Sequence, residues 1–306
     1  MPQPKKIVFI KPFNPYLPEL KAYMEYFSRH GYEVQTVKNT RELSGIRYDV
    51  EWHFMGIDRV PYKKGVIKIH EYGSLSTPPL SRLKNIIKKL ISRKPQFRVF
   101  LNEAVKNTFA FNDNVASCIR DMGVGNSFLN AINLPQQKQY DFCYLGNMHQ
   151  LRQLEDMLVY FKERLKNKTI LLIGEPTPHL KNKFGNCTNI HFTGMLNYDE
   201  VPKELAKCKF AINYVPNIHP YNIQTSTKVL DYCSCNLNII TNRYEWIEKF
   251  ESDNQASFLF LKDDFSNFTL ENIESFEYKN PKMQSFEWNS VIEKSGLPIL
   301  IAGLLK

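Results

Sequence analysis

The chain has 306 residues, of which 43% are hydrophobic and 23% are charged, so it has the composition of a globular protein and length enough for two domains. It contains no apolar stretch of about 18 residues, which excludes a helix that crosses a membrane. Residues 1–135 hold 21 basic and 11 acidic side chains and the remaining residues hold 19 and 20, so the net charge of +9 lies in the first part. We therefore expect this part to meet an anionic partner: nucleic acid, a membrane surface or a phosphorylated substrate.

The first part of the sequence alternates strand and helix patterns. Residues 6–10 are a short apolar run typical of a buried strand, and because Lys11 and Pro12 interrupt it, we expect a first strand and not a signal peptide. A helix is predicted over residues 19–31, where apolar residues recur on one face. Further strands are predicted over residues 32–37, 48–54, 65–72 and 97–103, and a second helix over residues 114–122. This alternation is typical of a mostly parallel sheet with helices on both faces.

The pattern restarts after a polar linker at Pro135. Strands are predicted over residues 141–146, 169–174, 189–194, 209–215 and 237–241, and helices over residues 150–166 and 201–208, with a helix-poor stretch before residue 189. The sequence therefore predicts an α/β fold with two doubly wound, Rossmann-like domains, residues 1–135 and 136–285. A C-terminal helix over residues 286–306 is expected to pack back across both.

One helix start has the composition of a phosphate site. The helix begins near Gln224, after a strand and a loop, and its first turn offers free backbone amides, the hydroxyls of Thr225, Ser226 and Thr227, and Lys228. Asp231 follows three residues later, where its carboxylate can accept hydrogen bonds from ribose hydroxyls. The alternative is a capped surface helix with a solvated pair of Lys228 and Asp231.

The order of the motifs favours the first interpretation. The segments YLGNMHQLRQLEDMLVYF, ILLIGE, NIHFTGML, VPKELAKCKFAINYVP and TSTKVLDYCSCNLNIIT, taken together, resemble the donor-binding domain of the GT-B glycosyltransferases of the retaining family 4 type over residues 140–245. The resemblance implies two domains that face a cleft and a nucleotide-diphosphate sugar as donor substrate. It also implies sugar transfer with retention, no obligatory cofactor and no metal.

The resemblance assigns the cations and the carboxylates. Gly146 matches the glycine that ends the family's first strand, Asn147 stands where the family has an arginine, and Arg152 stands where it has a lysine. The family's two glutamates, eight positions apart, fall on Ile223 and Asp231, so the first carboxylate is absent. We expect Arg152 and Lys228 to stabilise the negative charge that develops on the departing diphosphate.

The remaining donor contacts come from loops. The family's nucleobase segment corresponds to Gly194, Met195 and Leu196, and loop residues, His219 among them, replace the missing glutamate. The full predicted donor-binding set is Gly146, Asn147, Gly174, Gly194, Met195, Leu196, Tyr221, Asn222, Gln224, Thr225, Ser226, Thr227 and Asp231.

Residues of the first part are predicted to lie beside the transferred sugar and the acceptor. His70 and Glu71 are expected at a strand end that faces the cleft, where His70 resembles the family's histidine near the transferred sugar. Asn14 and Tyr16 lie in the loop after the first strand and are expected to contact the acceptor. The alternative for His70 is a hydrogen-bonded histidine of a polar loop. His53 ends another strand and is expected to pack with Trp52.

Residues 82–94 form a basic amphipathic pattern. Five apolar residues recur at helical spacing and six basic residues line the other side. Two interpretations remain: a helix that lies on an anionic membrane and brings the protein to a lipid-linked acceptor, or a helix that faces the core with a solvated basic back.

The sequence thus favours a glycosyltransferase that moves a sugar from a nucleotide sugar to a glycan or lipid-linked acceptor in cell-surface polysaccharide synthesis, such as lipopolysaccharide or capsule. The alternatives are a sugar-nucleotide epimerase of the same architecture and an inert protein that binds a sugar nucleotide or polyanion. Nucleic acid is disfavoured because no reading module is present. The six cysteines lack a metal-ligand spacing, so we expect reduced thiols and no zinc in a cytoplasmic protein, peripheral on the inner face of the membrane if residues 82–94 bind lipid.

Overall fold

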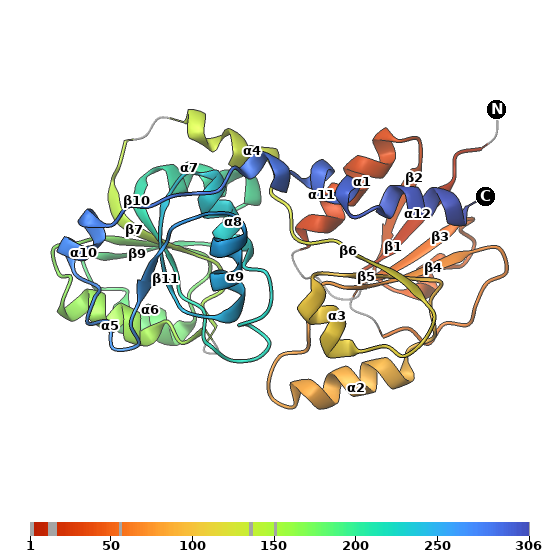
Figure 1. Ribbon diagram of the computed structural model, residues 1–306, viewed down its shortest axis with the longest axis horizontal. Helices are drawn as coiled ribbons and strands as arrows, with labels where there is room; N and C mark the ends of the chain where they lie inside the picture. The colour runs from red at the N-terminus through yellow and green to blue at the C-terminus, as the bar shows by residue number, and fades with distance from the viewer. Residues whose placement is uncertain (1–2, 12–16, 55–56, 135–136, 150–151, 306) are drawn as a thin grey trace. The chain divides into compact units, whose positions relative to one another are not determined.

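The computed structural model describes residues 3–11, 17–54, 57–134, 137–149 and 152–305, and the chain forms two compact units. Unit 1 comprises the chain up to residue 123 together with residues 288–306, and unit 2 comprises residues 124–287. Each unit contains one six-stranded sheet in which every paired strand is parallel. Helices cover the sheets (Figure 1), which confirms the predicted α/β fold with two Rossmann-like domains.

The sheet of unit 1 has the strand order β2-β1-β3-β4-β5-β6. Its strands are β1 Lys6–Ile10, β2 Glu33–Val37, β3 Val50–Phe54, β4 Ile67–Tyr72, β5 Phe97–Phe100 and β6 Ala116–Ile119. Its helices are α1 Pro18–Arg29, α2 Ser81–Ile91, α3 Glu103–Phe109, α11 Trp288–Lys294 and α12 Leu297–Leu304. The last two helices therefore belong to unit 1, although they follow unit 2 in the sequence.

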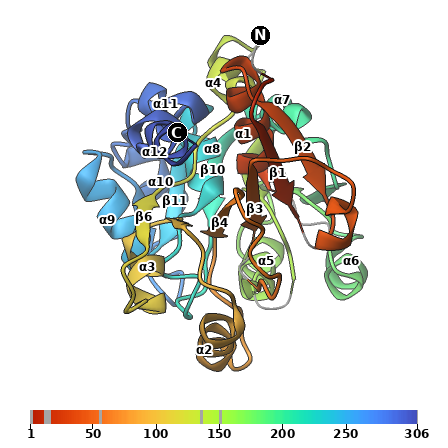
Figure 2. The same ribbon diagram turned by 90° about the vertical axis from the view of Figure 1, so that its right-hand side faces the viewer.

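The core of unit 1 is aromatic. The rings of Phe9, Tyr23 and Trp52 lie within 6.0 Å of one another, centroid to centroid, where α1 packs on the sheet. All three side chains are fully buried, so the apolar stripe predicted for the first helix does face the sheet. Figure 2 shows this packing of α1 over β1 and β3 from a second side.

The sheet of unit 2 has the strand order β12-β11-β10-β7-β8-β9. Its strands are β7 Tyr140–Leu145, β8 Ile170–Ile173, β9 Ile190–Gly194, β10 Cys208–Asn213, β11 Asn238–Asn242 and β12 Leu259–Leu261. Its helices are α4 Asn126–Leu129, α5 Glu155–Glu163, α6 Pro178–Phe184, α7 Val201–Ala206, α8 Thr227–Ser234, α9 Glu245–Asp253 and α10 Leu270–Ser275. The chain winds from β7 through β8 to β9 and then returns to place β10 on the other side of β7. The gap between the ends of β7 and β10 is therefore the switch point of the sheet, where ligands bind in open α/β folds.

Four predicted elements differ from the structure. The C-terminal helix expected over residues 286–306 is divided into α11 and α12 before Gly296, which has a φ of 71°. The helix expected over residues 114–122 is the strand β6, because residues 116–119 supply the backbone partners that β5 needs along its outer edge. The helix expected from residue 150 begins at Glu155, since Gln153 has a φ of 53°, which ends any helix. The stretch before residue 189 holds the short helix α6, which Thr177 caps by accepting from the amide of Leu180 at 3.3 Å. Within the described part of the chain, none of the helices has the length and apolar character needed to traverse a bilayer.

Candidate functional site

Three glycines form one edge of the sheet in unit 2. Gly146, Gly174 and Gly194 end or follow β7, β8 and β9 and have φ values of 123°, 140° and 72°. The amide of Gly146 donates to the carbonyl of Ile173 at 2.9 Å, and the amide of Gly174 donates to the carbonyl of Gly194 at 3.2 Å. Because the strands are parallel, these three turns meet at the carboxyl edge. The predicted donor-binding glycines thus lie together.

Replacement of Gly174 by alanine is expected to destabilise unit 2 by about 3 kcal/mol. A Cβ atom there would lie 2.4 Å from the carbonyl oxygen of Gly146, and the φ of 140° is unfavourable for any side chain. Gly194→Ala is the matched control, because Gly194 also has a positive φ, 72°, but a Cβ there would lie 3.5 Å from its nearest atom. We expect this control to lower the free energy of unfolding by about 1 kcal/mol. Urea unfolding of both variants measures the difference, and equal losses would contradict the close approach of the two loops.

Lys228 projects from the first turn of α8 toward the end of β7. Its Nζ donates to the hydroxyl of Tyr144 at 3.0 Å and lies 4.1 Å from the centroid of that ring. The Tyr144 hydroxyl in turn donates to the carbonyl of Asn147 at 3.2 Å. A Cβ at Gly146 would lie 3.8 Å from the Lys228 Nζ, so the turn at Gly146 passes close to the ammonium. The side chain of Lys228 is thus fixed at the switch point.

Arg152 lies on the same side as Lys228. Its guanidinium stacks 4.5 Å from the ring centroid of Tyr221, which belongs to the loop before α8. Burial and the positive charge of Arg152 lower the pKa of Lys228 well below its ordinary value. Among the described residues neither cation forms an ion pair with a carboxylate. Two neighbouring cations without a counter-charge favour a bound anion.

The N-cap residue of α8 makes no side-chain hydrogen bond to the first turn of the helix. Ser226 occupies the N-cap position, but its hydroxyl donates to the side-chain oxygen of Asn213 at 3.2 Å and does not cap the helix. Asn213 is itself held by Thr241 and Tyr244 at 2.9 and 2.8 Å. The amide of Val229 donates to the carbonyl of Ser226 at 3.1 Å, and the N-terminal end of the helix adds its dipole to the positive field of the two cations.

The loop before α8 is held by its own hydrogen bonds. The side chain of Gln224 donates to the carbonyl of Pro220 at 3.1 Å, and that of Asn222 donates to Asn217 at 3.1 Å. Thr225 and Gln224 are both partly buried. These contacts give the loop a fixed form beside Arg152, and the predicted role of its residues in sugar binding stays a prediction.

Asp231 does not pair with Lys228. Its carboxylate is buried and accepts from the Tyr198 hydroxyl at 3.4 Å, and burial raises its pKa to about 8. The alternative of a solvated surface pair is therefore wrong, because the Lys228 side chain reaches toward Tyr144 instead. The role predicted for Asp231 toward a ribose stays a prediction. Met195, by contrast, is 77% exposed next to Gly194, and Leu196 is partly buried.

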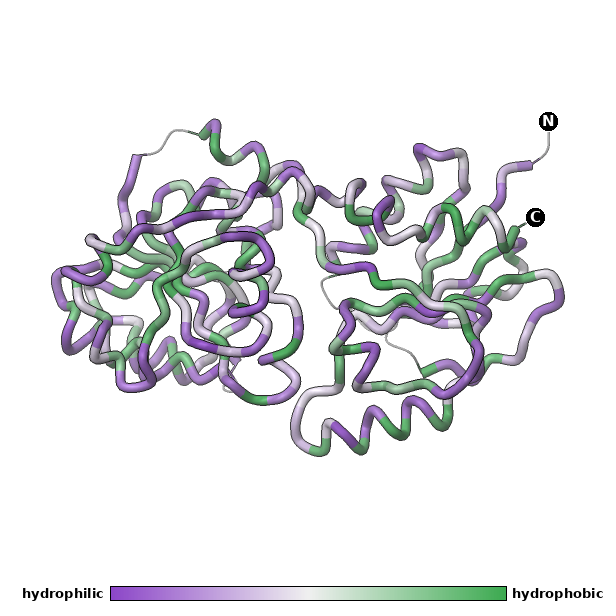
Figure 3. The backbone as a smooth tube through the Cα atoms, in the orientation of Figure 1, coloured by the Kyte–Doolittle hydropathy of each residue, from purple (hydrophilic) through white to green (hydrophobic). Residues whose placement is uncertain are grey.

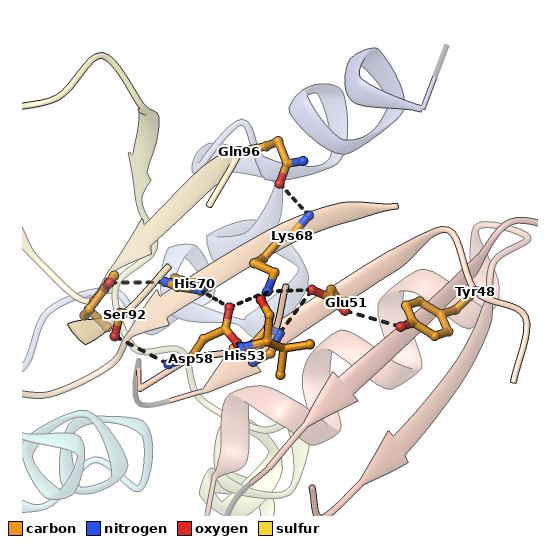
Figure 4. A network of polar contacts seen from close by, with 10 residues as sticks. Tyr48, Glu51, His53, Asp58, Lys68, His70, Ser92 and Gln96 are labelled. Atoms are coloured by element: carbon orange, nitrogen blue, oxygen red, sulfur yellow. Dashed lines mark hydrogen bonds and ion pairs between the residues drawn. The ribbon is translucent and has the colours of Figure 1, made fainter. Parts of the chain in front are cut away.

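His70 and Glu71 are buried in unit 1, and neither presents an exposed group to a ligand as the sequence suggested. His70 lies in β4, where its Nε2 is 3.2 Å from Asp58 (Figure 4). Its Nδ1 is 3.3 Å from the Tyr72 hydroxyl. Burial lowers the pKa of His70. Glu71 accepts from Arg120, and burial raises the pKa of Glu71 to about 7. Both side chains are satisfied internally because successive residues of β4 point into the two covered faces of the sheet.

The other residues predicted in unit 1 add no exposed group. Asn14 and Tyr16 lie outside the described residues. His53 is buried and lies 3.5 Å from Glu51, and its ring is 5.5 Å from that of His70, so it joins a polar network and does not simply pack with Trp52.

One group of side chains in unit 1 has the donor atoms of a metal site. The ligand atoms of Glu51, His53 and Asp58 lie within 4.8 Å of one another. However, the ammonium of Lys68 lies 3.0 Å from Glu51 and also contacts Asp58 (Figure 4). Lys68 thus already balances both carboxylates at the centre of the group, which disfavours a divalent cation there.

Comparison with solved structures identifies the architecture. The chain matches sucrose-phosphate synthase from Thermosynechococcus elongatus with a TM-score of 0.67, at 11% identity over 98% of this chain and 100% of the other. It matches HepE from Anabaena, solved with UDP and glucose, with a TM-score of 0.65 at 9% identity over 97% and 99%. It also matches a UDP-GlcNAc 2-epimerase from Methanocaldococcus jannaschii, solved with UDP-GlcNAc and UDP, with a TM-score of 0.59 at 12% identity over 97% and 100%.

The protein therefore has the GT-B glycosyltransferase fold. No family model and no curated protein sequence matches the chain. At these identities the likeness is one of fold, so the function has to be argued from the residues of the site.

Sequence reasoning missed Tyr144 as a site residue. Tyr144 lies near the end of β7, two positions before Gly146. Its hydroxyl reaches the turn that follows the strand, where it donates to the carbonyl of Asn147 and accepts from Lys228. This spacing was visible in the sequence and is the signal that could have identified Tyr144.

Proposed function

We propose that the protein is a glycosyltransferase that transfers a sugar from a nucleoside-diphosphate donor to a glycan or glycolipid acceptor. The observation that carries the proposal is the pair of cations, Lys228 and Arg152, without a carboxylate partner among the described residues, beside the N-terminal end of α8. UDP, UDP-glucose and UDP-GlcNAc are the ligands named for HepE and the epimerase, which share the fold. A nucleoside diphosphate supplies the anion that this site requires.

The cations and amides also account for the chemistry of transfer. When the bond between the anomeric carbon and the diphosphate breaks, negative charge grows on the phosphate oxygens. Preorganised cations near those oxygens then stabilise the transition state more than the ground state. Burial and Arg152 lower the pKa of Lys228, and a bound diphosphate would raise that pKa again, so binding of the anion and protonation of Lys228 are coupled.

The finer features of the proposal follow the resemblance in sequence. We propose transfer of a hexosyl or related group with retention, without an obligatory metal or cofactor, in the synthesis of a cell-surface polysaccharide, lipopolysaccharide or capsule on the cytoplasmic side. Asp231 is proposed to contact the ribose, and Met195 and Leu196 the nucleobase. His70 is buried in the described structure, so its proposed place near the transferred sugar depends on a change in its surroundings.

A panel of UDP-, GDP-, ADP- and dTDP-sugars tests the proposal. Purified protein is incubated with each donor, and release of the nucleoside diphosphate is followed with and without a mixture of glycan and glycolipid acceptors. We expect one nucleotide class to bind and turn over. Thermal stabilisation by a nucleoside diphosphate without turnover would favour the inert binder, and interconversion of the donor sugar without release of the nucleotide would favour the epimerase.

Tyr144→Phe is expected to weaken the binding of the nucleoside diphosphate about fivefold. The substitution keeps the buried ring but removes the hydroxyl that accepts from Lys228, a hydrogen bond of about 1 kcal/mol. Tyr160→Phe is the matched control, since it also removes one hydroxyl of unit 2, which donates to the carbonyl of Phe268 at 3.1 Å away from Lys228. Calorimetric titration should show unchanged affinity in the control, and an equal effect of both substitutions would contradict a role of Tyr144 in positioning Lys228.

A further inference from the structure

The apolar face of α2 points away from unit 1. Leu83, Ile86, Ile87 and Leu90 recur at helical spacing on one face, and these four side chains are between 43% and 76% exposed. A surface helix ordinarily turns such a stripe toward the core. The interpretation of residues 82–94 as a helix that faces the core is therefore wrong. Figure 3 shows the alternation of hydrophobic and hydrophilic residues along α2.

The helix is attached to unit 1 by its polar side. Asn85 is the buried residue of α2, and its side-chain oxygen accepts from the amide of Ser76 at 3.0 Å. Lys89 donates to the carbonyl of Ala110, and its ammonium lies 5.5 Å from the centroid of the Phe111 ring. Asn85 follows Leu83 by two positions, which is about 200° around a helix, so the attachment and the apolar stripe are on opposite sides. These contacts hold the stripe outward. The helix itself lies beside α3 (Figures 1 and 2).

The residue before the helix extends the same exposed surface. Leu80 has a φ of 62°, in the left-handed region that a leucine rarely adopts, and its side chain is 69% exposed. The strained backbone is therefore not balanced by packing of the leucine within the described part of the chain. Strain of this kind persists where it serves an interaction.

The charge around the stripe is uniformly positive. Exposed Arg82 and Lys84 flank it, about 100° to either side of Leu83, and exposed Arg93 and Lys94 follow the end of the helix. The sequence has no acidic residue between Glu71 and Glu103. An apolar stripe bordered by cations complements the surface of an anionic bilayer, in which acyl chains lie beneath negative head groups.

We propose that residues 80–94 are a docking surface for an anionic lipid bilayer, with Leu80, Leu83, Ile86, Ile87 and Leu90 inserted among the acyl chains and the flanking cations at the phosphates. A second copy of the chain would bring two positively charged surfaces together, and a nucleic acid would leave the stripe unused. The inference goes beyond the proposed function and does not depend on it, since lipid binding is measured without donor or acceptor.

Co-sedimentation of the full chain with vesicles tests this inference. One set of vesicles contains phosphatidylcholine alone and the other also contains phosphatidylglycerol. We expect binding to the second set that weakens as salt is raised. Ile86→Gln/Leu90→Gln is expected to lower the partition coefficient at least about tenfold, and Arg82→Gln/Lys84→Gln/Arg93→Gln on the order of a hundredfold.

The controls separate docking from other causes. All substituted side chains are exposed, so the melting temperature should stay unchanged. Ile299→Gln removes another exposed apolar side chain of unit 1, which is 78% exposed on α12, and should leave vesicle binding intact. Equal binding to both vesicle sets, or unchanged binding of Ile86→Gln/Leu90→Gln, would overturn the proposal. The proposal would also be overturned if the protein bound no vesicle and formed a dimer that Ile86→Gln/Leu90→Gln dissociates. The stripe would then be a contact between two copies of the chain.

Discussion

Replacement of Lys228 by methionine is expected to lower the rate constant of sugar transfer about 100- to 1000-fold, as the loss of one preorganised donor to a developing anion does in other enzymes. The ammonium at the switch point is held by Tyr144 and has no carboxylate partner among the described residues. Methionine has a similar length and fits a partly buried position. Rates with saturating donor measure the effect, and Lys203→Met, at an exposed lysine on α7, should leave them unchanged.

The same substitution is expected to keep or raise the stability of unit 2. Burial and Arg152 lower the pKa of Lys228 from its ordinary 10.5, so at neutral pH the folded state holds a proton less readily than the unfolded state does. The free energy of unfolding of the native protein should therefore rise with pH between the lowered pKa and about 10.5, and this part of the rise should vanish in Lys228→Met. An inactive variant that is also unstable would instead indicate a structural role for the lysine. Full activity would exclude Lys228 from the reaction.

The sequence predicts the architecture well because period and spacing are local properties. The apolar runs at residues 6–10 and 169–174 contain the strands β1 and β8. The helix predicted to begin near Lys228 is α8, which follows β10 as expected. The helix predicted over residues 114–122 is wrong because the four residues of β6 form a strand through their pairing with β5. Whether these four residues form a strand depends on the neighbouring strand and not on their own conformational propensity.

The sequence predicted that the two cations of the candidate site lie close together, but it did not predict which carboxylates are buried. Lys228 and Arg152 lie on one side because the start of α8 and the loop after β7 both lie at the carboxyl edge. The burial of Asp231 and His70 depends on neighbours far along the chain, such as Tyr198 and Asp58, which no local spacing indicates. Motif spacing therefore identifies backbone and cation positions better than it identifies which acid or histidine reaches solvent.

The stability of unit 1 depends on a buried charged pair that the sequence does not reveal. Arg120 and Glu71 are both fully buried and bonded to each other. The Arg120 Nε also donates to the Tyr23 hydroxyl at 2.6 Å, and the Trp52 indole donates to Glu71 at 2.8 Å. Nearly every polar atom of the pair thus has a partner, the condition under which a buried pair is tolerated.

Removal of one member of this pair is expected to be among the most destabilising single changes in the chain. Arg120→Met should lower the free energy of unfolding by about 3–5 kcal/mol near pH 8, because it leaves Glu71 buried without a counter-charge. The carboxyl of Glu71 would then stay protonated in the folded state up to a higher pH, since burial already raises its pKa to about 7. The unfolded state releases that proton near the ordinary value of 4.5, so the loss should shrink as pH falls toward 5.

The double substitution Arg120→Met/Glu71→Gln separates the charge from the packing. It removes both charges. The resulting loss in the free energy of unfolding should be smaller than the sum of the losses of the two single substitutions by at least about 1 kcal/mol, and it should depend little on pH between 5 and 8. Urea unfolding of the four proteins at pH 5 and pH 8 completes the cycle. Two results would contradict this role of the guanidinium as the counter-charge of Glu71: additive losses of stability, or a loss in Arg120→Met that is the same at both pH values. Either result would show that Arg120 acts through its contacts with Tyr23 and Trp288. The ring centroid of Trp288 lies 5.6 Å from the guanidinium.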